Sequence, residues 1–186
     1  LTHMGKLKND MTYGILWSVL ERFSTQGMQF ILGIVLARLL TPSDYGLIAM
    51  TAVFLSISHA LVDSGFSQAL IQKKNTSEKD FHTIFHFNFL VSILVYSILF
   101  FLARPISVFY EIPQLSAIIE VIGLNLILHS FSIIPIAKLS RKLDFKTLAK
   151  ATLLSVAVSG VVSIYLAYQG WGVWALVAQV LIKSTL

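Results

Sequence analysis

The sequence contains no cysteine and little charge. The absence of cysteine from its 186 residues excludes a disulfide framework, a thiolate metal site and a cysteine nucleophile. Charged residues make up only 12% of the chain. The chain also lacks a phosphate-binding glycine loop, an HExxH or GxSxG motif, and any long polar segment that could carry an active site. We therefore expect no enzyme activity, no cofactor and no metal.

Apolar residues dominate instead. They account for 56% of the chain, and the mean hydropathy of +0.79 exceeds that of ordinary soluble domains. The sequence therefore predicts an integral membrane protein. The formal net charge of +5 does not indicate nucleic-acid binding, because the basic residues lie in short connections without an aromatic-interleaved basic face. The first apolar segment, which carries Glu21 and Arg22, is too long and too charged for a cleavable signal peptide.

Stretches long enough to cross a bilayer recur along the chain. A hydrocarbon core of about 30 Å needs about 20 helical residues. We expect five complete spans and an incomplete sixth at about residues 13–40, 44–70, 82–103, 114–138, 147–168 and 172–186. The predicted fold class is therefore all-α, with a six-helix transmembrane bundle over residues 1–186. The chain begins at Leu1 rather than methionine and ends at Leu186 without a polar tail, so we expect it to be part of a longer protein.

The turn between the first two spans has clear helix-start signals. Thr41 is placed to accept a hydrogen bond from an early amide of the second helix. Pro42 suits the first helical turn, where its missing N–H would be unpaired in any case, and the carboxylate of Asp44 favours the positive end of the helix. The sequence therefore predicts a tight helix-to-helix reversal.

Lysine and arginine fall mainly at alternate ends of the spans. Arg38 and Arg104 lie at one side, and ten basic residues lie at the other. These ten are Lys6, Lys8, Lys73, Lys74, Lys79, Lys138, Arg141, Lys142, Lys146 and Lys150. Because cytoplasmic loops are enriched in basic residues, this bias predicts a multi-pass protein with a cytoplasmic N-terminus. Tyr168, Trp171 and Trp174 then lie at the outer interface, which amphipathic rings favour.

Polar residues recur on one face of several spans. They are Ser18, Arg22, Thr25 and Gln29 in the first span, Ser56, His59, Asp63 and Ser67 in the second, Asn88, Ser92 and Tyr96 in the third, Asn125, His129 and Ser132 in the fourth, and Thr152, Ser155, Ser159 and Ser163 in the fifth. Such faces predict a polar interior in the bilayer. We take Gln29, Asn88 and Asn125 as candidates for its lining. The serines of the fifth span, beside Gly160, are more typical of close helix packing.

Charges inside the spans are the most informative residues, because an unpaired ion in hydrocarbon is costly and normally faces a partner or a water-filled cavity. Arg22 and Lys183 are predicted to form a cationic lining that meets an anionic substrate. Asp63 and Glu21 are candidates for ion coupling. The alternative is a structural ion pair between Arg22 and Asp63, which lie at matching depth in neighbouring spans.

Three further features have two interpretations each. His82 and His86 have a spacing that suits a metal, but without a third ligand interfacial polarity is the simpler interpretation. His59 and His129 could relay protons or be hydrogen-bonded packing residues. Pro135 should kink the fourth span, either as a hinge or as a helix end.

Five segments in order along the chain resemble one family of bacterial membrane proteins. They are ARLLTPSDYGLIAM at 37–50, DSGFSQALIQKK at 63–74, FYEIPQL at 109–115, AKLSRKLDFKTLAKA at 137–151 and GWGVWALVAQ at 170–179. They are similar to segments of oligosaccharide flippases of the Wzx type, in the branch of lipopolysaccharide, capsule and colanic acid exporters. This branch belongs to the superfamily that includes the MATE multidrug transporters.

The resemblance implies a two-lobe transporter of the bacterial inner membrane, with this chain as its N-terminal lobe and the second lobe absent. It also implies alternating access and a substrate of sugars on an isoprenoid pyrophosphate. Membrane lipids and other polysaccharide assembly proteins are the further partners it implies. Two alternatives are a cation-coupled multidrug exporter on the same architecture and a non-transporting scaffold of a polysaccharide assembly complex.

Overall fold

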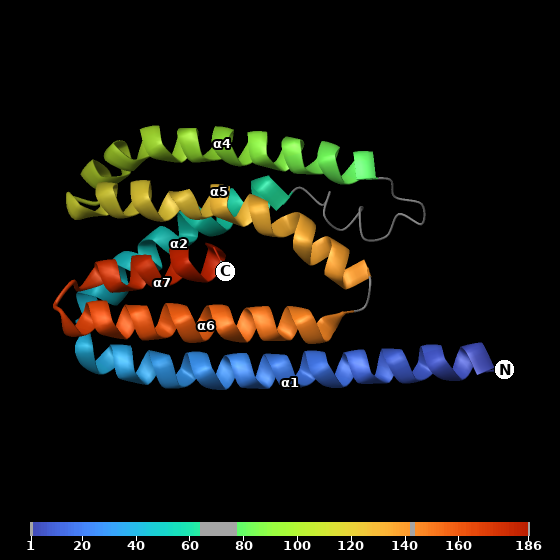
Figure 1. Ribbon diagram of the computed structural model, residues 1–186. Coiled ribbons are helices and arrows are strands. Elements are labelled where there is room, and N and C mark those ends of the chain that lie inside the picture. The colour runs from blue at the N-terminus through green and yellow to red at the C-terminus, as the bar shows by residue number, and fades with distance from the viewer. Residues whose placement is uncertain (1, 64–77, 142–143, 186) are drawn as a thin grey trace.

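The structure, a computed structural model, describes residues 2–63, 78–141 and 144–185. Within these ranges the chain forms six helices. They are α1 (Thr2–Leu39), α2 (Pro42–Asp63), α4 (Glu78–Phe109), α5 (Gln114–Arg141), α6 (Phe145–Tyr168) and α7 (Val173–Thr185). The predicted all-α fold class is confirmed. The helices run alternately in opposite directions, and α1–α2, α4–α5 and α6–α7 are joined at the same end of the bundle (Figure 1).

Four of the helices are long and apolar enough to cross a membrane. The candidate spans are Pro42–Val62, Phe81–Phe109, Pro113–Ser140 and Lys146–Tyr168. Helix α7 is apolar but has only 13 residues. Helix α1 is continuous through the first expected span but is not among the four, because polar residues such as Arg22, Gln26 and Gln29 lower its hydropathy. The division into lobes, with a second lobe outside this chain, remains a prediction.

The helices form one continuous series of neighbours. Helix α1 packs on α6, α6 on α7, α7 on α5 and α5 on α4, while α2 packs against α4, α5 and α7 (Figure 1). One apolar core joins α2, α4 and α5 through residues such as Val62, Leu99 and Leu126. A second joins α1, α6 and α7 through residues such as Leu36 and Leu176. The first and last parts of the chain therefore lie side by side.

Helix α4 is longer than the expected third span. It begins at Glu78 and continues through Pro105 to Phe109, whereas the sequence predicted a span of about 82–103 followed by an irregular connection. Proline lacks the N–H of a helical hydrogen bond and bends the helix without ending it here (Figure 1). The helix ends instead before Glu111, whose positive φ of 57° reverses the chain.

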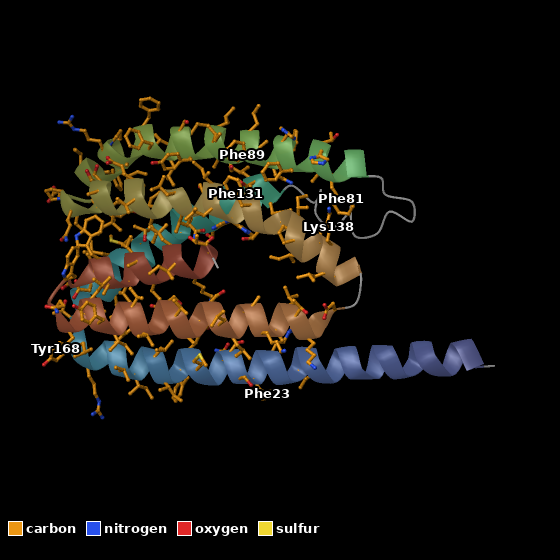
Figure 2. All side chains as sticks on the ribbon, viewed as in Figure 1. Phe23, Phe81, Phe89, Phe131, Lys138 and Tyr168 are labelled. Carbon is orange, nitrogen blue, oxygen red and sulfur yellow. The ribbon has the colours of Figure 1, made fainter. Side chains whose placement is uncertain are left out.

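Pro135 also lies inside a continuous helix, since α5 extends from Gln114 to Arg141. Figure 1 shows α5 bending over its last turns, beyond the point where α7 ends. Helices α4 and α5 remain packed along this length. Phe89 lies against Phe131 with ring centroids 5.4 Å apart, and the ammonium of Lys138 lies 4.9 Å from the ring centroid of Phe81 (Figure 2). The predicted kink is therefore observed.

The predicted helix start at Thr41 is observed in detail. The Thr41 hydroxyl oxygen accepts from the backbone N–H of Asp44 at 3.4 Å, and the Asp44 carboxylate accepts from the backbone N–H of Thr41 at 2.9 Å. This reciprocal pair is a capping box, with aspartate at the third helical position. The Asp44 carboxylate also accepts from the backbone N–H of Val173, the first residue of α7. Asp44 therefore connects the starts of two helices.

Candidate functional site

Two hollows meet at Lys183, near the end of α7. The first has a volume of about 270 Å³ and lies among α1, α2, α6 and α7. Its polar lining residues are Gln29, Tyr45, Ser159, Gln179 and Lys183. We call it the α1–α7 cleft. Because α1 and α7 are far apart in sequence, this cleft exists only in the folded bundle.

The second hollow has a volume of about 500 Å³ and lies between α5 and α6, with the last residues of α7 as its floor. We call it the α5–α6 cavity. Its polar lining residues are His129, Ser132, Thr152, Ser155, Lys183, Ser184 and Thr185. Apolar residues such as Phe131, Pro135 and Leu148 complete the wall. Lys183 lines both hollows, so its ammonium contributes one positive charge to the lining of each.

None of the described residues that line the two hollows carries a carboxylate. A single ammonium among hydroxyl, amide and imidazole groups makes a surface that donates hydrogen bonds and attracts anions. Organic cations would find no opposite charge there. In electrostatic terms, this polar surface suits an anionic ligand.

Helix α5 presents the predicted polar face of Asn125, His129 and Ser132 to α7. The Asn125 amide donates to the Val180 carbonyl at 3.4 Å, and the Ser132 hydroxyl donates to the Ser184 carbonyl at 3.4 Å. His129 lies on the same face between these two contacts. This face therefore serves partly as a packing surface between two helices.

The structure brings two of the predicted cavity residues together. Gln29 and Lys183, from opposite ends of the chain, both line the α1–α7 cleft. Arg22 lies two turns before Gln29 on α1 and is exposed, outside the residues that line either hollow. Asn125 contacts α7 as described above. The predicted roles of these residues remain predictions.

Asn88 lies elsewhere in the bundle. It is fully buried in α4, and neither of its amide atoms has a hydrogen-bond partner in the described part of the chain. It lines neither hollow. The side chains of Asp63 and Glu21, the two candidates for ion coupling, lie outside what the structure describes.

Gln179 and Tyr45 line the cleft and were not singled out from the sequence. Gln179 lies four residues before Lys183, so helical spacing alone would have placed both on one face of α7. Tyr45 follows the capping residue Asp44 and has no comparable signal, because its position in the cleft depends on how α2 packs against α1 and α7.

The described residues include no group of three or more histidine or acidic side chains that could hold a metal ion. His82 and His86 are both exposed, and the His86 Nδ1 is 2.7 Å from the His82 carbonyl oxygen. The i, i+4 pair therefore has a local hydrogen bond along its own helix.

The long apolar helices define a multi-pass α-helical membrane protein. The family profile described as "Polysaccharide biosynthesis protein" matches residues 35–186. The chain belongs to this family of polysaccharide biosynthesis proteins.

Curated relatives agree with this family. The chain is 24% identical over 174 residues to the succinoglycan biosynthesis transport protein ExoT of Rhizobium meliloti (strain 1021), covering 94% of the chain and 35% of the relative. It is 26% identical over 142 residues to the lipopolysaccharide biosynthesis protein WzxC of Escherichia coli (strain K12), and the match covers 76% of the chain and 28% of the relative. It is 23% identical over 188 residues to the teichuronic acid biosynthesis protein TuaB of Bacillus subtilis (strain 168), and the match covers 98% of the chain and 38% of the relative.

The chain thus spans roughly a third of the length of these relatives. No solved structure matches the chain.

Proposed function

We propose that this chain is the N-terminal lobe of a flippase that moves an isoprenoid-pyrophosphate-linked oligosaccharide from the cytoplasmic to the outer leaflet of the bacterial inner membrane. The observation that carries the proposal is the position of Lys183, a cation at the junction of two hollows whose described lining has no carboxylate. The family membership supports a role in polysaccharide biosynthesis, and the name of ExoT, a succinoglycan biosynthesis transport protein, supports a role in transport.

The proposed mechanism is alternating access without bond cleavage. Lys183 and, nearer the cytoplasm, Arg22 offset the negative charge of the pyrophosphate as the polar head enters the bundle. The amides of Gln29 and Gln179 and the Tyr45 hydroxyl supply neutral hydrogen-bonding groups that suit sugar hydroxyls. The isoprenoid tail stays in lipid, where its apolar surface has no need of a protein partner.

The experiment replaces Arg22 and Lys183 together by glutamine in the full-length protein and measures the lipid-linked oligosaccharide pool on each face of the membrane. A membrane-impermeant glycan-modifying reagent reports the sidedness. We expect the complete intermediate to accumulate on the cytoplasmic face, because the barrier to bringing an anion into the bilayer is no longer offset. The matched control replaces Lys146 and Lys150, exposed at the start of α6, by glutamine.

Normal export by the Arg22→Gln, Lys183→Gln variant at normal protein levels would overturn the proposal. Deletion of the full gene could change drug sensitivity while the lipid-linked oligosaccharide pool still faces outward. That result would favour the multidrug exporter. Unchanged sidedness in every intramembrane charge variant, together with loss of polysaccharide in the deletion strain, would favour the scaffold.

A further inference from the structure

Asn88 of α4 is fully buried and lines neither of the two hollows. Its amide atoms, Nδ2 and Oδ1, both lack a hydrogen-bond partner among the described residues. Asn88 lies seven residues after Phe81, the start of the candidate span Phe81–Phe109, which is about 10 Å along the helix. A buried amide at this depth costs stability unless another group bonds to it. The groups that surround Asn88 therefore decide its role.

Ser130 of α5 lies opposite Asn88 in the interface between α4 and α5. The two helices are antiparallel, and Phe81 packs with Ala137 in one apolar cluster (Figure 1). Ser130 lies seven residues before Ala137, so it is level with Asn88. The phenylalanines that follow these two residues in sequence contact each other, which marks the same level (Figure 2). Ser130 is also fully buried.

Ser92 adds a third polar group. It lies one turn after Asn88 on the same face of α4 and is fully buried. The Ser92 hydroxyl donates to the Phe89 carbonyl at 2.8 Å, and the Ser130 hydroxyl donates to the Ile127 carbonyl at 2.7 Å. Each serine oxygen keeps lone pairs that can accept a further hydrogen bond. We call Asn88, Ser92 and Ser130 the polar layer.

The interface on either side of the polar layer is apolar. Phe81 and Ala137 fill it towards the start of α4, and Val95, Leu99 and Leu126 fill it in the other direction. In a membrane, apolar contacts between helices hardly select partners, because lipid is equally apolar, whereas interhelical hydrogen bonds do select them. The polar layer is therefore the part of this interface where hydrogen bonds can join α4 to α5.

We propose that the polar layer binds water, and that this water bridges α4 and α5. Water supplies both kinds of partner, because it accepts from the Asn88 Nδ2 and donates to the Asn88 Oδ1 and to the serine oxygens. Short serine side chains on both helices leave more room here than the leucine, valine and phenylalanine side chains beside the layer. This site does not depend on the proposed function.

An ion suits the polar layer less well than water does. None of its three side chains is charged, and an uncompensated ion inside a membrane is costly. A neutral molecule that both donates and accepts hydrogen bonds satisfies the amide without adding charge. The polar layer is therefore a hydration site.

The first test is water-edited solid-state NMR of the isotope-labelled full-length protein in lipid bilayers, which measures how fast magnetisation passes from water to each amide group. We expect the Asn88 side-chain amide to receive it several-fold faster than the backbone amides of Val95 and Leu99, which are buried in the same helix outside the polar layer. No substitution is needed, so the result does not depend on whether a variant folds. Equal rates would overturn the water site and favour a protein side chain as the partner of Asn88.

The second test is a double-mutant cycle on Asn88 and Ser130. We expect Ser130→Ala to lower the apparent unfolding temperature of the full-length protein by about 2 °C more when Asn88 is present than in the Asn88→Leu variant, because leucine has no amide for the water to reach. The control is Ser163→Ala, which removes an equally buried serine of α6 that donates to the Gly160 carbonyl. This control should lower the temperature equally in both proteins. Equal effects of Ser130→Ala in the two proteins would overturn the bridge between α4 and α5. Asn88→Ala replaces Asn88→Leu if the leucine variant does not fold.

Discussion

At the scale of single residues, Asp44 acts on two helices at once. Its carboxylate accepts from the Thr41 backbone N–H at 2.9 Å and the Thr41 hydroxyl at 2.6 Å, and it also accepts from the Val173 backbone N–H. Gly172 leaves room for this contact, because a Cβ there would lie 3.1 Å from the Asp44 Oδ1, and its φ of 54° favours glycine. One carboxylate thereby joins the α1–α2 turn to the α6–α7 turn.

We predict that Asp44→Ala destabilises the protein by about 2 kcal/mol, because it removes the cap of α2 and the contact to α7 together. The comparison is Asp144→Ala, which removes the N-cap of α6, where the carboxylate accepts from the Thr147 backbone N–H at 3.1 Å. That loss should be about 1 kcal/mol. Unfolding of the full-length protein in detergent, followed by tryptophan fluorescence, measures both. Equal losses would mean that the Val173 contact adds nothing.

At the scale of elements, the pairing of α1 with α6 depends on a close approach at Gly160. A Cβ built at this position would overlap the methyl carbons of Leu32. Ser159 and Ser163, both buried, donate to carbonyls of their own helix, at Val156 and Gly160. This agrees with the interpretation of the fifth-span serines as small packing residues, since short side chains let helices approach closely in a membrane.

Gly160→Val should therefore push α1 away from α6 and destabilise the protein by about 1 to 3 kcal/mol through overpacking. Adding Leu32→Ala to Gly160→Val should recover part of that loss, because it removes the side chain that clashes. Gly27→Val on α1 is the control, since nothing lies within 4 Å of the corresponding Cβ. Failure of Leu32→Ala to recover any stability would place the cost in helix propensity rather than in the α1–α6 contact. The unfolding assay described above measures each variant.

At the scale of the whole molecule, the alternating helix directions gather the turns at two ends. The α1–α2, α4–α5 and α6–α7 turns share one end, and the start of α6 lies at the other (Figure 1). Lys138, Lys146 and Lys150 all belong to the second end, which the basic-residue bias assigns to the cytoplasm. The lack of cysteine in this chain makes the assignment directly measurable.

We predict that Glu111→Cys and Gln169→Cys react with a membrane-impermeant thiol reagent added outside intact cells, because both positions are exposed in turns at the end that the basic-residue bias predicts to face outward. Lys146→Cys and Lys150→Cys should react only after the membrane is permeabilised. Lys150 and Gln169 lie at opposite ends of α6, so they form a matched pair on one helix. The reverse labelling pattern would overturn the cytoplasmic placement of the N-terminus.

The agreement between sequence and structure is greatest where the signals are local. The capping box of Thr41 and Asp44, the apolar spans and the bend at Pro135 all arise from a few adjacent residues. The main difference in the helices is at Pro105, which was expected to lie in a connection. Proline breaks a helix when nothing else supports the next turn, and here Ile106 in the following turn packs against the apolar core of α2, α4 and α5.

The candidate site was only partly predictable. Lys183 and Gln29 were chosen because polar groups inside apolar spans need partners, and both line the α1–α7 cleft. Asn88 and Asn125 were chosen on the same argument, yet Asn88 lines neither hollow and Asn125 contacts α7. A polar face on a helix predicts that the face contacts another helix or a cavity, but it does not identify which of them.

The sequence alone determined the membrane class, most of the helices and the α1–α2 turn, because hydropathy and capping depend on residues close together in the chain. The tertiary structure decided that α1 packs on α6, that Gln29 and Lys183 share a cleft, and that His59 meets His129. The physical reason is that apolar side chains are nearly equally stable against lipid or against another helix, so hydropathy does not select partners. Close packing and a few interhelical hydrogen bonds select them, and these depend on residues distant in sequence.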